Sequence, residues 1–533
     1  MRDTPERNGA GARALPLTAV AAAVAVFTGL VVATISTTGG VFEYPLDDTY
    51  IHLALAEQIA QGNYGINAGE RAAPGSSLVF PLLLTPFAGQ PFQRYLPVLW
   101  SLVGLVGAAW IWGRLLFEAG YGRREWRWFG LAAAALVPTV LQLPQVAFLG
   151  MEHTLHTAGA LLVVLGLYRY LTGTGATRGA AVLVIVGALI GSAFRLEAMA
   201  LGLLAGGVLF FTGQRLFGAL AWLAALLPVV LFSAVLLSLG LEAMPSSVHV
   251  KLAQFGQLGD DRLIKRLASV IWNMSQPGGY LLGVFSSALL VLPLFLPGLR
   301  ASRLKLLSFT LGAAGVAHLL AGQIGWLRRY ENYALIVTAV GLLVVLAPVT
   351  KPATPRLPVA AALTAMLAAG LFAYPPGSIK MLPGGAHTIL VQQGEMARFA
   401  QDYLDAPVAV NDIGRVAWAN PNFVLDLWGL ASEEARRIRL NHRKPGWAGR
   451  LTAARNVPVA MVYDNWIKDG IGADWVRIGQ LDLNIPRYFL GGDSVAFYAT
   501  SPDQVDMLRG KLAEWVPTLR RGVQFVWEEG MAP

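Results

Sequence analysis

The chain has 533 residues, of which 55% are hydrophobic and only 14% are charged. A soluble globular protein carries about 25% charged residues, so this composition is typical of a membrane protein with several spans. The net charge is +9, but the basic residues flank hydrophobic segments, which indicates orientation in a membrane and attraction to anionic lipid rather than nucleic-acid binding. The absence of cysteine excludes disulfides, thiol catalysis and cysteine metal ligands.

Apolar segments recur along the first two thirds of the chain. A membrane span needs about 20 mainly apolar residues. After a short basic tail, residues 1–15, the first segment is expected to be a retained signal anchor rather than a cleaved signal peptide. The sequence therefore predicts an α-helical polytopic membrane protein with about eleven transmembrane helices in residues 16–375. The expected spans are 16–37, 94–117, 128–149, 153–171, 179–194, 197–211, 216–240, 279–298, 305–321, 332–349 and 357–375.

Charged residues in the loops predict the orientation. Basic loops are retained in the cytoplasm, and a cytoplasmic N-terminus gives that pattern if residues 76–89 do not span. This piece has about 14 residues, so it is expected to be an interfacial helix in the first outer loop, residues 38–93. The inner residues are then Arg114, Arg123, Arg124, Arg127, Arg169, Arg178, Arg215, Arg300, Arg303, Lys305, Lys351 and Arg356. The outer acids are Asp47, Asp48, Glu57, Glu70, Glu152, Glu197, Asp260 and Asp261.

The composition changes after the last expected span. Residues 376–385 are rich in proline and glycine and are expected to form a linker. Residues 386–533 are mixed and charged, and predict an α/β domain of about 150 residues. Eleven spans place this domain outside, in the periplasm of a bacterium. Buried strands are expected at 408–412, 423–430 and 458–464, with helices at 394–405 and 502–515.

The first outer loop contains an acidic pair, Asp47-Asp48, a few residues after the first span. Acids so close to a bilayer are costly unless a site uses them, so each is a candidate general base, metal ligand or helix cap. Asp48 can cap a helix that begins at Thr49 and ends near Gln61, and His52 lies one turn after it. Capping needs only one acid, which leaves Asp47 without a structural role.

Further charges recur where predicted spans reach the outer face. Each set alone is compatible with a simple ion pair or an ordinary loop residue. Together with Asp47 and Asp48 they suit one chemistry, in which cations hold a phosphate leaving group and a carboxylate takes a proton from an attacking hydroxyl. These residues are Glu152 and His153, Arg195 and Glu197, His249 and Lys251, and Arg328, Arg329 and Glu331.

Several segments resemble, in order, those of the GT-C superfamily of integral-membrane glycosyltransferases. The loop LDDTYIHLALAEQ is similar to their acidic loop, GMEHTLH to "GMEt-L", FRLEAM to "R-x-E-G", PSSVHVKL to "PNT-x-x-x-K" and LRRYENYAL to "RYE-x-Y". NDIGRVAWAN and VLDLWGL are similar to a "D-x-G…DLxGL" signature of the outer domain. The resemblance covers residues 40–430, and is nearest to the arabinofuranosyltransferase-like and mannosyltransferase-like branches. Leu196 stands where proline is common, and Ser246-Ser247 replace Asn-Thr.

The resemblance implies an inverting transfer of a monosaccharide from a polyprenyl-phosphate donor to a glycan, lipid or protein acceptor at the outer face of the bacterial plasma (inner) membrane. Asp47 or Asp48 would be the base, with Asp47 preferred because Asp48 has the capping role. Lys251, Arg328, Arg329 and His249 would bind the donor phosphate. His52, Glu152, Arg195, Glu197 and Glu331 would position sugar or acceptor or support the site. Some members use a divalent cation at the acidic loop and others do not, so no metal ligands are assigned.

Two other classes of protein remain. A transporter or lipid-glycan flippase should have repeated halves and broken helices near the membrane midplane, and neither pattern is evident in the sequence. A non-catalytic scaffold with a partner-binding outer domain would not need charges converging from five outer segments. A polyprenyl-phosphate-dependent glycosyltransferase is therefore the favoured interpretation, with the transporter as the alternative.

Overall fold

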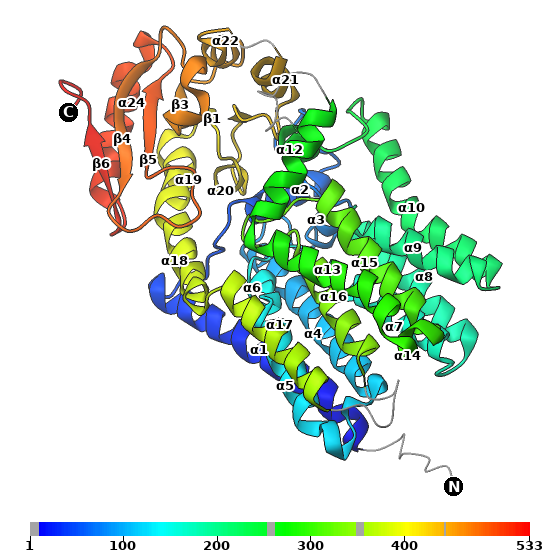
Figure 1. Cartoon of the computed structure of the whole chain (residues 1–533). Coiled ribbons are helices and arrows are strands. Elements are labelled where there is room, and N and C mark those ends of the chain that lie inside the picture. Colours follow the sequence, from blue (N-terminus) through cyan, green and yellow to red (C-terminus); the bar gives the residue numbers. More distant parts are fainter. Residues whose placement is uncertain (1–9, 253–261, 348–355, 442–443) are drawn as a thin grey trace. The chain divides into compact units, whose positions relative to one another are not determined.

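The computed structural model describes residues 10–252, 262–347, 356–441 and 444–533 and is mostly helical, with a small C-terminal sheet (Figure 1). Its residues form two compact units, each described here by itself. The helical unit comprises residues 1–30, 97–231 and 257–379. The mixed unit comprises residues 31–96, 232–256 and 380–533, so it combines the first predicted outer loop and part of a later one with the C-terminal domain. Asp260, Asp261 and Lys351 lie outside the described residues.

Long apolar helices agree with the membrane protein that the composition predicts. In the described ranges, seven helices are long and apolar enough to cross a membrane. Each begins and ends within a few residues of a predicted span, although α1 starts six residues before its predicted start at residue 16. They are α1 (Ala10–Thr37), α4 (Leu96–Leu116), α7 (His153–Thr172), α8 (Thr177–Phe194), α10 (Arg215–Ser238), α13 (Pro277–Phe295) and α15 (Leu304–Ala321).

The prediction of eleven spans is not confirmed. The segment 128–149 divides into α5 (Arg127–Val140) and α6 (Leu143–Phe148), because Gln142 between them adopts a left-handed conformation with φ of 69°. Helices α9 (Ala198–Phe211) and α16 (Asn332–Val345) have only 14 residues each. Helix α17 (Arg356–Ala373) meets the following helices at a bend of 51°, and counting this bent pair as one span gives eight.

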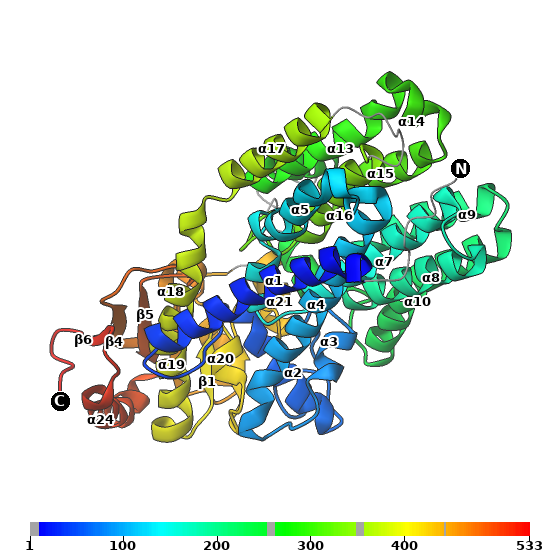
Figure 2. The same ribbon diagram turned by 90° about the horizontal axis from the view of Figure 1, so that it is seen from below.

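Glycines allow α7 and α8 to pack closely in the helical unit, where the two helices lie side by side (Figures 1 and 2). A Cβ added at Gly159 would lie 2.6 Å from the backbone nitrogen of Gly191, and one at Gly187 would lie 2.6 Å from the carbonyl oxygen of Gly159. Small residues of this kind let membrane helices approach. The contact brings the end of α8 beside the start of α7, which positions Arg195 next to Glu152.

Among the described residues, the C-terminal sheet has six strands in the order β2-β1-β3-β5-β4-β6. Strands β1 (Val408–Val410), β2 (Val424–Asp426) and β3 (Val459–Val462) confirm the three predicted strands and pair in parallel. Strands β4 (Val476–Leu483), β5 (Ser494–Ala499) and β6 (Val523–Trp527) add an antiparallel half that the sequence analysis did not predict. The carboxyl ends of β1 and β2 lead into the two segments that resemble "D-x-G" and "DLxGL".

Side chains alternate between the two faces of this sheet, as the strand repeat requires. Ala409, Ala460 and Ala496 face a core that includes residues of α21 (Glu433–Asn441) and α22 (Trp447–Ala454). On the other face, Phe497 packs against Phe399 and Trp515. These two residues belong to the helical turn 399–404 and to α24 (Val505–Trp515), which lies beside the strands in Figure 1.

The remaining segments are also helical, some where helices were predicted and others where loops or a linker were expected. The first outer loop contains α2 (Asp48–Ala60), as predicted, whereas the interfacial helix expected at 76–89 is only α3 (Val79–Leu83). The proline- and glycine-rich residues 376–385 are helical and continue through α18 (Met381–Thr388). The other helices are α11 (Ser246–Leu252), α12 (Arg262–Ser275), α14 (Pro297–Ala301), α19 (Gly394–Arg398), α20 (Gly414–Ala417) and α23 (Asp464–Ile467).

Candidate functional site

Asp47 is bound by the C-terminal domain rather than free at the end of a helix. Its side chain is buried, with Oδ2 accepting a hydrogen bond from the Gly414 backbone N–H at 2.5 Å and Oδ1 accepting one from the Arg415 N–H at 2.8 Å. The predicted cap is wrong in its register, because Asp47 occupies the N-cap position of α2 and Asp48 is the first helical residue. Asp47 makes no side-chain capping bond, since its carboxylate is used by the other segment.

The segment Asn411–Arg415 is shaped to receive this carboxylate. A Cβ added at Gly414 would lie 2.1 Å from the carbonyl oxygen of Asp47, so only glycine allows the approach. The Asp412 carboxyl hydrogen-bonds to Asp47 and accepts a bond from the Gln393 amide at 2.8 Å. The resemblance to "D-x-G" therefore has a physical basis here, in a carboxyl pair and a glycine that lets the two segments meet.

Burial raises the pKa of both carboxyl groups in the Asp47–Asp412 pair. Burial raises the pKa of Asp47, although the backbone N–H of Arg415 and the Asp412 hydrogen bond oppose the rise. The pKa of Asp412 is raised well above its ordinary value, first by burial and then by the neighbouring charge of Asp47. These directions favour the arrangement in which the Asp412 carboxyl donates the hydrogen bond to Asp47. Asp48, by contrast, is half-buried in the first turn of α2.

Two further contacts join the first outer loop to the C-terminal domain within the mixed unit. A Glu57 carboxylate oxygen accepts the Ala419 N–H at 3.0 Å. The Asn67 amide accepts the Val424 N–H at 2.8 Å and donates to the Val424 carbonyl at 2.9 Å, as a neighbouring strand would. The loop thus recognises backbone groups along the β1 and β2 segments, which fixes the position of Asp47 and Asp48 relative to the sheet.

The segment after β2 explains the resemblance to "DLxGL". The Asp426 carboxylate accepts hydrogen bonds from the N–H groups of Trp428 at 2.7 Å and Ala431 at 2.6 Å, which closes a tight turn. Gly429 in this turn has a φ of 86°, where an L side chain is strained. This signature is therefore structural in the described chain. His52, predicted to support the site, is buried against Phe80 and Gly75.

In the helical unit, Arg195 lies between two glutamates. Its guanidinium donates to Glu152 at 2.8 Å and to Glu197 at 2.6 Å. Only 5% of the Arg195 side chain and none of the Glu152 side chain is exposed. Burial opposes the charge of Arg195, but Glu197 and Glu152 hold its pKa above the ordinary value. From the sequence, these residues could form either a simple ion pair or part of a site. In the structure both glutamates bind the same arginine.

A third predicted segment joins this Arg195 cluster (Glu152, Arg195 and Glu197). The Tyr330 ring lies 5.3 Å from the Arg195 guanidinium and 4.9 Å from that of Arg329. Arg329 also donates to the Met151 sulfur at 3.0 Å. The Tyr333 hydroxyl donates to the Glu197 carbonyl at 3.1 Å. The segments that resemble "GMEt-L", "R-x-E-G" and "RYE-x-Y" therefore converge on one buried polar cluster inside an apolar helical unit.

Arg328 belongs to a neighbouring cluster with different contacts. It donates to the Gln142 amide oxygen at 2.8 Å and to the Ser378 hydroxyl at 2.7 Å, and lies over the Tyr374 ring at 4.7 Å. All three partners are neutral. Glu331 accepts bonds from the Gly325 N–H at 2.9 Å and the Tyr374 hydroxyl at 3.1 Å, and burial raises its pKa to about 7.

The backbone before Arg329 is strained. Trp326, Leu327 and Arg328 all have left-handed φ values, of 43°, 61° and 63°. Each such residue costs about 1–2 kcal/mol, so the surroundings must hold the turn in place. The contacts of Arg328 and of Glu331 with Gly325 provide that support. The turn separates Arg328 from Arg329, so that the two adjacent arginines enter different clusters.

The two units divide the predicted site residues between them. The mixed unit contains Asp47, Asp48 and His52, and the helical unit contains the Arg195 cluster with Arg328, Arg329 and Glu331. The side chains of His249 and Lys251, on α11, are outside the described residues. Four residues of these clusters were not predicted from the sequence as site residues: Asp412, Tyr330, Tyr333 and Tyr374. The available signals were the acid of the quoted "D-x-G" segment for Asp412 and the LRRYENYAL segment for Tyr330 and Tyr333, whereas no local signal marked Tyr374.

The described carboxylates do not fit a divalent cation at the acidic loop. Both Asp47 oxygens already accept backbone N–H bonds. Within the described ranges, no group of three or more His, Asp or Glu side chains is placed to hold a metal ion.

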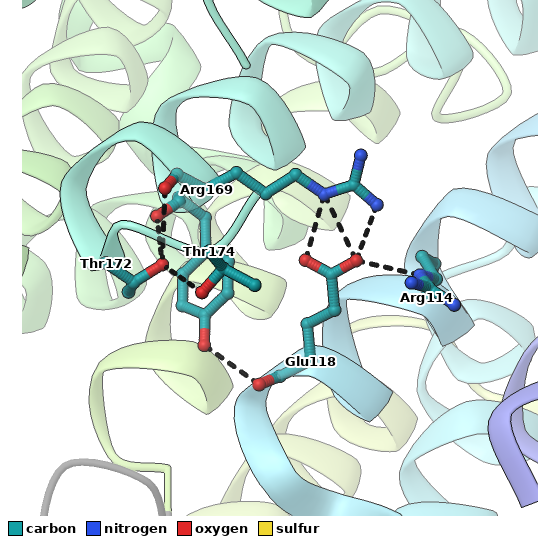
Figure 3. Close-up of polar contacts among 6 residues, drawn as sticks. Arg114, Glu118, Arg169, Thr172 and Thr174 are labelled. Atoms are coloured by element: carbon teal, nitrogen blue, oxygen red, sulfur yellow. Dashed lines mark hydrogen bonds and ion pairs between the residues drawn. The ribbon is translucent and has the colours of Figure 1, made fainter. Parts of the chain in front are cut away.

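A second charged cluster lies where α4 and α7 end (Figure 3), whereas Glu152 of the Arg195 cluster lies where α7 begins. Glu118 accepts hydrogen bonds from Arg114 at 2.7 Å and from Arg169 at 2.5 and 3.0 Å. Thr172 bonds to Thr174 at 2.8 Å at the end of α7. We call Arg114, Glu118 and Arg169 the Glu118 cluster. The two arginines were predicted only as inner-loop charges, and they join the ends of two helices.

Residues 387–498 are similar to a family described as "Domain of unknown function (DUF8728)". This stretch runs from the helices before β1 into β5, and includes both Asp412 and Asp426. No curated protein and no solved structure matches the chain.

Proposed function

We propose that the protein is a membrane glycosyltransferase that transfers a monosaccharide from a polyprenyl-phosphate donor to a hydroxyl of a cell-envelope glycan, lipid or protein. The reaction would take place at the outer face of a bacterial plasma membrane, with the sheet domain in the periplasm. The observation that carries the proposal is the Arg195 cluster, in which three separate segments bring buried charges together among apolar helices. Buried ionisable groups in membrane proteins are costly and usually functional.

The acceptor hydroxyl would lose its proton to Asp48 as its oxygen attacks the anomeric carbon. Asp48 is the preferred base because its side chain is more exposed than that of the buried Asp47, whose two oxygens accept backbone N–H groups. The bond between the anomeric carbon and the phosphate oxygen breaks in the same displacement, which inverts the configuration. Asp47 and Asp412 act as positioning residues that fix the start of α2.

The leaving polyprenyl phosphate carries negative charge, which requires cations. Arg328 is the preferred phosphate ligand among the described residues, since its side-chain hydrogen bonds go to neutral partners and it is half-buried. Arg329 is a second candidate, and Lys251 and His249 remain candidates from the sequence. Arg195 would position the sugar through its glutamates rather than bind the phosphate, because two carboxylates already balance its charge.

The test measures polyprenyl phosphate release by purified protein supplied with a panel of polyprenyl-phosphate sugars and a glycan acceptor. We expect Asp48→Asn to lose about 100-fold or more of the rate, which is the usual contribution of a general base, without loss of thermal stability. Glu125→Gln, at an exposed acid, is the matched control and should retain full activity. Asp47→Asn should lower thermal stability, because an amide cannot accept both backbone bonds.

The outcomes separate the alternatives. Unchanged release in Asp48→Asn would remove Asp48 as the base, and loss in Asp47→Asn at full thermal stability would restore Asp47 to that role. Folded wild-type protein that releases phosphate from none of the donors would overturn the transferase. Lipid-glycan movement across proteoliposomes without release would then favour the transporter.

A further inference from the structure

Helix α12 has a different residue pattern from the spanning helices. Leu263, Leu267 and Ile271 recur every four residues and so lie on one face. Their exposed fractions are 66%, 54% and 68%, respectively. Ile264 and Met274 widen the same apolar face and are also exposed. Lys265, Arg266, Ser269 and Asn273 lie on the opposite side of the helix. The helix is therefore amphipathic, and its apolar side is the exposed one.

The polar side anchors α12 to the helical unit. Asn273 is buried, and its amide donates to the carbonyl oxygens of Leu319 and Gly322, both at 3.0 Å, at the end of α15. A Cβ added at Gly279 would lie 1.7 Å from the Asn273 carbonyl oxygen, so the start of α13 passes closely. These contacts hold one end of the helix while its apolar face stays uncovered by the described chain.

The chemistry of the exposed side identifies what covers it. Large apolar side chains in water are unfavourable, and apolar residues beside basic ones are typical of helices that lie in a membrane interface. Trp272 lies seven residues after Lys265, on the same side of the helix, and is 53% exposed; tryptophan prefers the headgroup level of a bilayer. Lys265 and Arg266 complement anionic headgroups rather than a second basic surface of the same chain.

We propose that α12 docks on a bilayer surface that contains anionic phospholipid, with Leu263, Leu267 and Ile271 inserted at the headgroup boundary and Lys265 and Arg266 on the phosphates. The inference does not depend on the proposed glycosyl transfer. Docking on anionic lipid also explains why Lys265 and Arg266 lie in a loop that the predicted topology places outside. Basic residues are otherwise expected in the cytoplasmic loops.

The absence of cysteine permits a direct test in the full-length protein. Leu267→Cys and Arg266→Cys, each the single cysteine, are labelled with bimane and placed in nanodiscs with or without phosphatidylglycerol. We expect a doxyl-labelled lipid to quench the label at 267 and aqueous iodide to quench the label at 266. Val230→Cys, on the exposed side of α10, is the control for ordinary lipid contact and should not respond to the headgroup charge.

The charge requirement is tested in the Leu267→Cys background. Lys265→Gln with Arg266→Gln should reduce the docked-to-undocked ratio at 267 about fivefold per removed charge, and only in nanodiscs with phosphatidylglycerol. Iodide quenching of 266 and 267 alike would overturn the proposal, because the face would be in water. Protection of 267 from both quenchers would overturn it in favour of a protein occupant, and lipid quenching that is independent of phosphatidylglycerol would remove the anionic requirement.

Discussion

The Arg195 cluster and the Glu118 cluster have the same ionic groups in opposite arrangement. One arginine lies between two glutamates in the first, and one glutamate lies between two arginines in the second (Figure 3). The central side chains of the two clusters are equally buried, since Arg195 and Glu118 are each 5% exposed, but their partners differ. Glu152 and Glu197 are 0% and 20% exposed, whereas Arg114 and Arg169 are 36% and 26% exposed. Exposed ion pairs contribute little, whereas a buried charge depends wholly on its partners. The burial of the partner residues, and not the presence of an ion pair, therefore distinguishes the Arg195 cluster, the functional candidate, from the Glu118 cluster, which only joins two helices.

The largest effect is expected from removing the buried arginine. Arg195→Ala would remove the counter-charge that Arg195 supplies to Glu152 and Glu197 in an apolar unit, at a cost of about 3–5 kcal/mol in stability. The check is the thermal unfolding midpoint in detergent, with Arg169→Ala as the matched control. Equal losses in the two variants would break the comparison.

Glu331 sharpens the comparison, because it is a buried glutamate whose hydrogen-bond donors are neutral. Burial raises the pKa of Glu331 from 4.5 to about 7 on folding. The folded state therefore binds this proton more tightly than the unfolded state, which stabilises the protein at low pH. That contribution to stability is lost as pH rises from about 4.5 through 7. Glu331→Gln keeps a neutral side chain at every pH. Its stability relative to wild type should increase by about 2–3 kcal/mol between pH 5 and pH 8. A difference that does not change with pH would contradict the raised pKa.

The Asp47 contact extends the comparison to a carboxylate held by backbone N–H groups. Gly414→Ala would force a Cβ against the Asp47 carbonyl and should cost about 1–3 kcal/mol. Gly510→Ala is the control, because it has open space within α24 and should stabilise that helix by up to about 1 kcal/mol. Thermal unfolding of both variants decides the point. A Gly414→Ala protein as stable as wild type would show that the two segments need not meet this closely.

How much of the fold could be predicted depended on whether a local pattern determines the structure. The runs VAVND and PVAMVYD predicted buried strands correctly, and both strands lie in the parallel part of the sheet, where strands are continuously apolar. Strand β4 was missed, since its register shifts between Arg477 and Gly479 and its residues mix polar and apolar types. Span 128–149 was predicted as one helix because composition does not reveal that Gln142 turns left-handed.

The candidate site was predictable where its residues carry charge next to apolar segments. Glu152, Arg195 and Glu197 were identified in this way, and the structure brings them together. Asp412 was not identified, because its partner Asp47 is distant in sequence and only the folded sheet joins them. The different surroundings of Arg328 and Arg329 depend on a strained turn that no local preference predicts.

The smallest effect is expected at the Glu118 cluster. Arg114→Ala leaves Glu118 with Arg169, and the removed side chain is partly exposed, so the loss should be only about 0.2–1 kcal/mol and should shrink further in high salt. Unfolding midpoints at low and high salt test this. A salt-independent loss as large as that of Arg195→Ala would remove the distinction based on burial.

The most direct measurement is the rate of polyprenyl phosphate release by reconstituted Arg195→Lys protein, compared with Arg169→Lys. Lysine keeps the charge at each position but cannot bridge two carboxylates as a guanidinium does. We expect Arg195→Lys to lose about 100-fold in rate through misplacement of the site, with a smaller loss of thermal stability than Arg195→Ala, and Arg169→Lys to retain its activity. Full activity in Arg195→Lys, or equal losses in both variants, would contradict a transferase site at the Arg195 cluster.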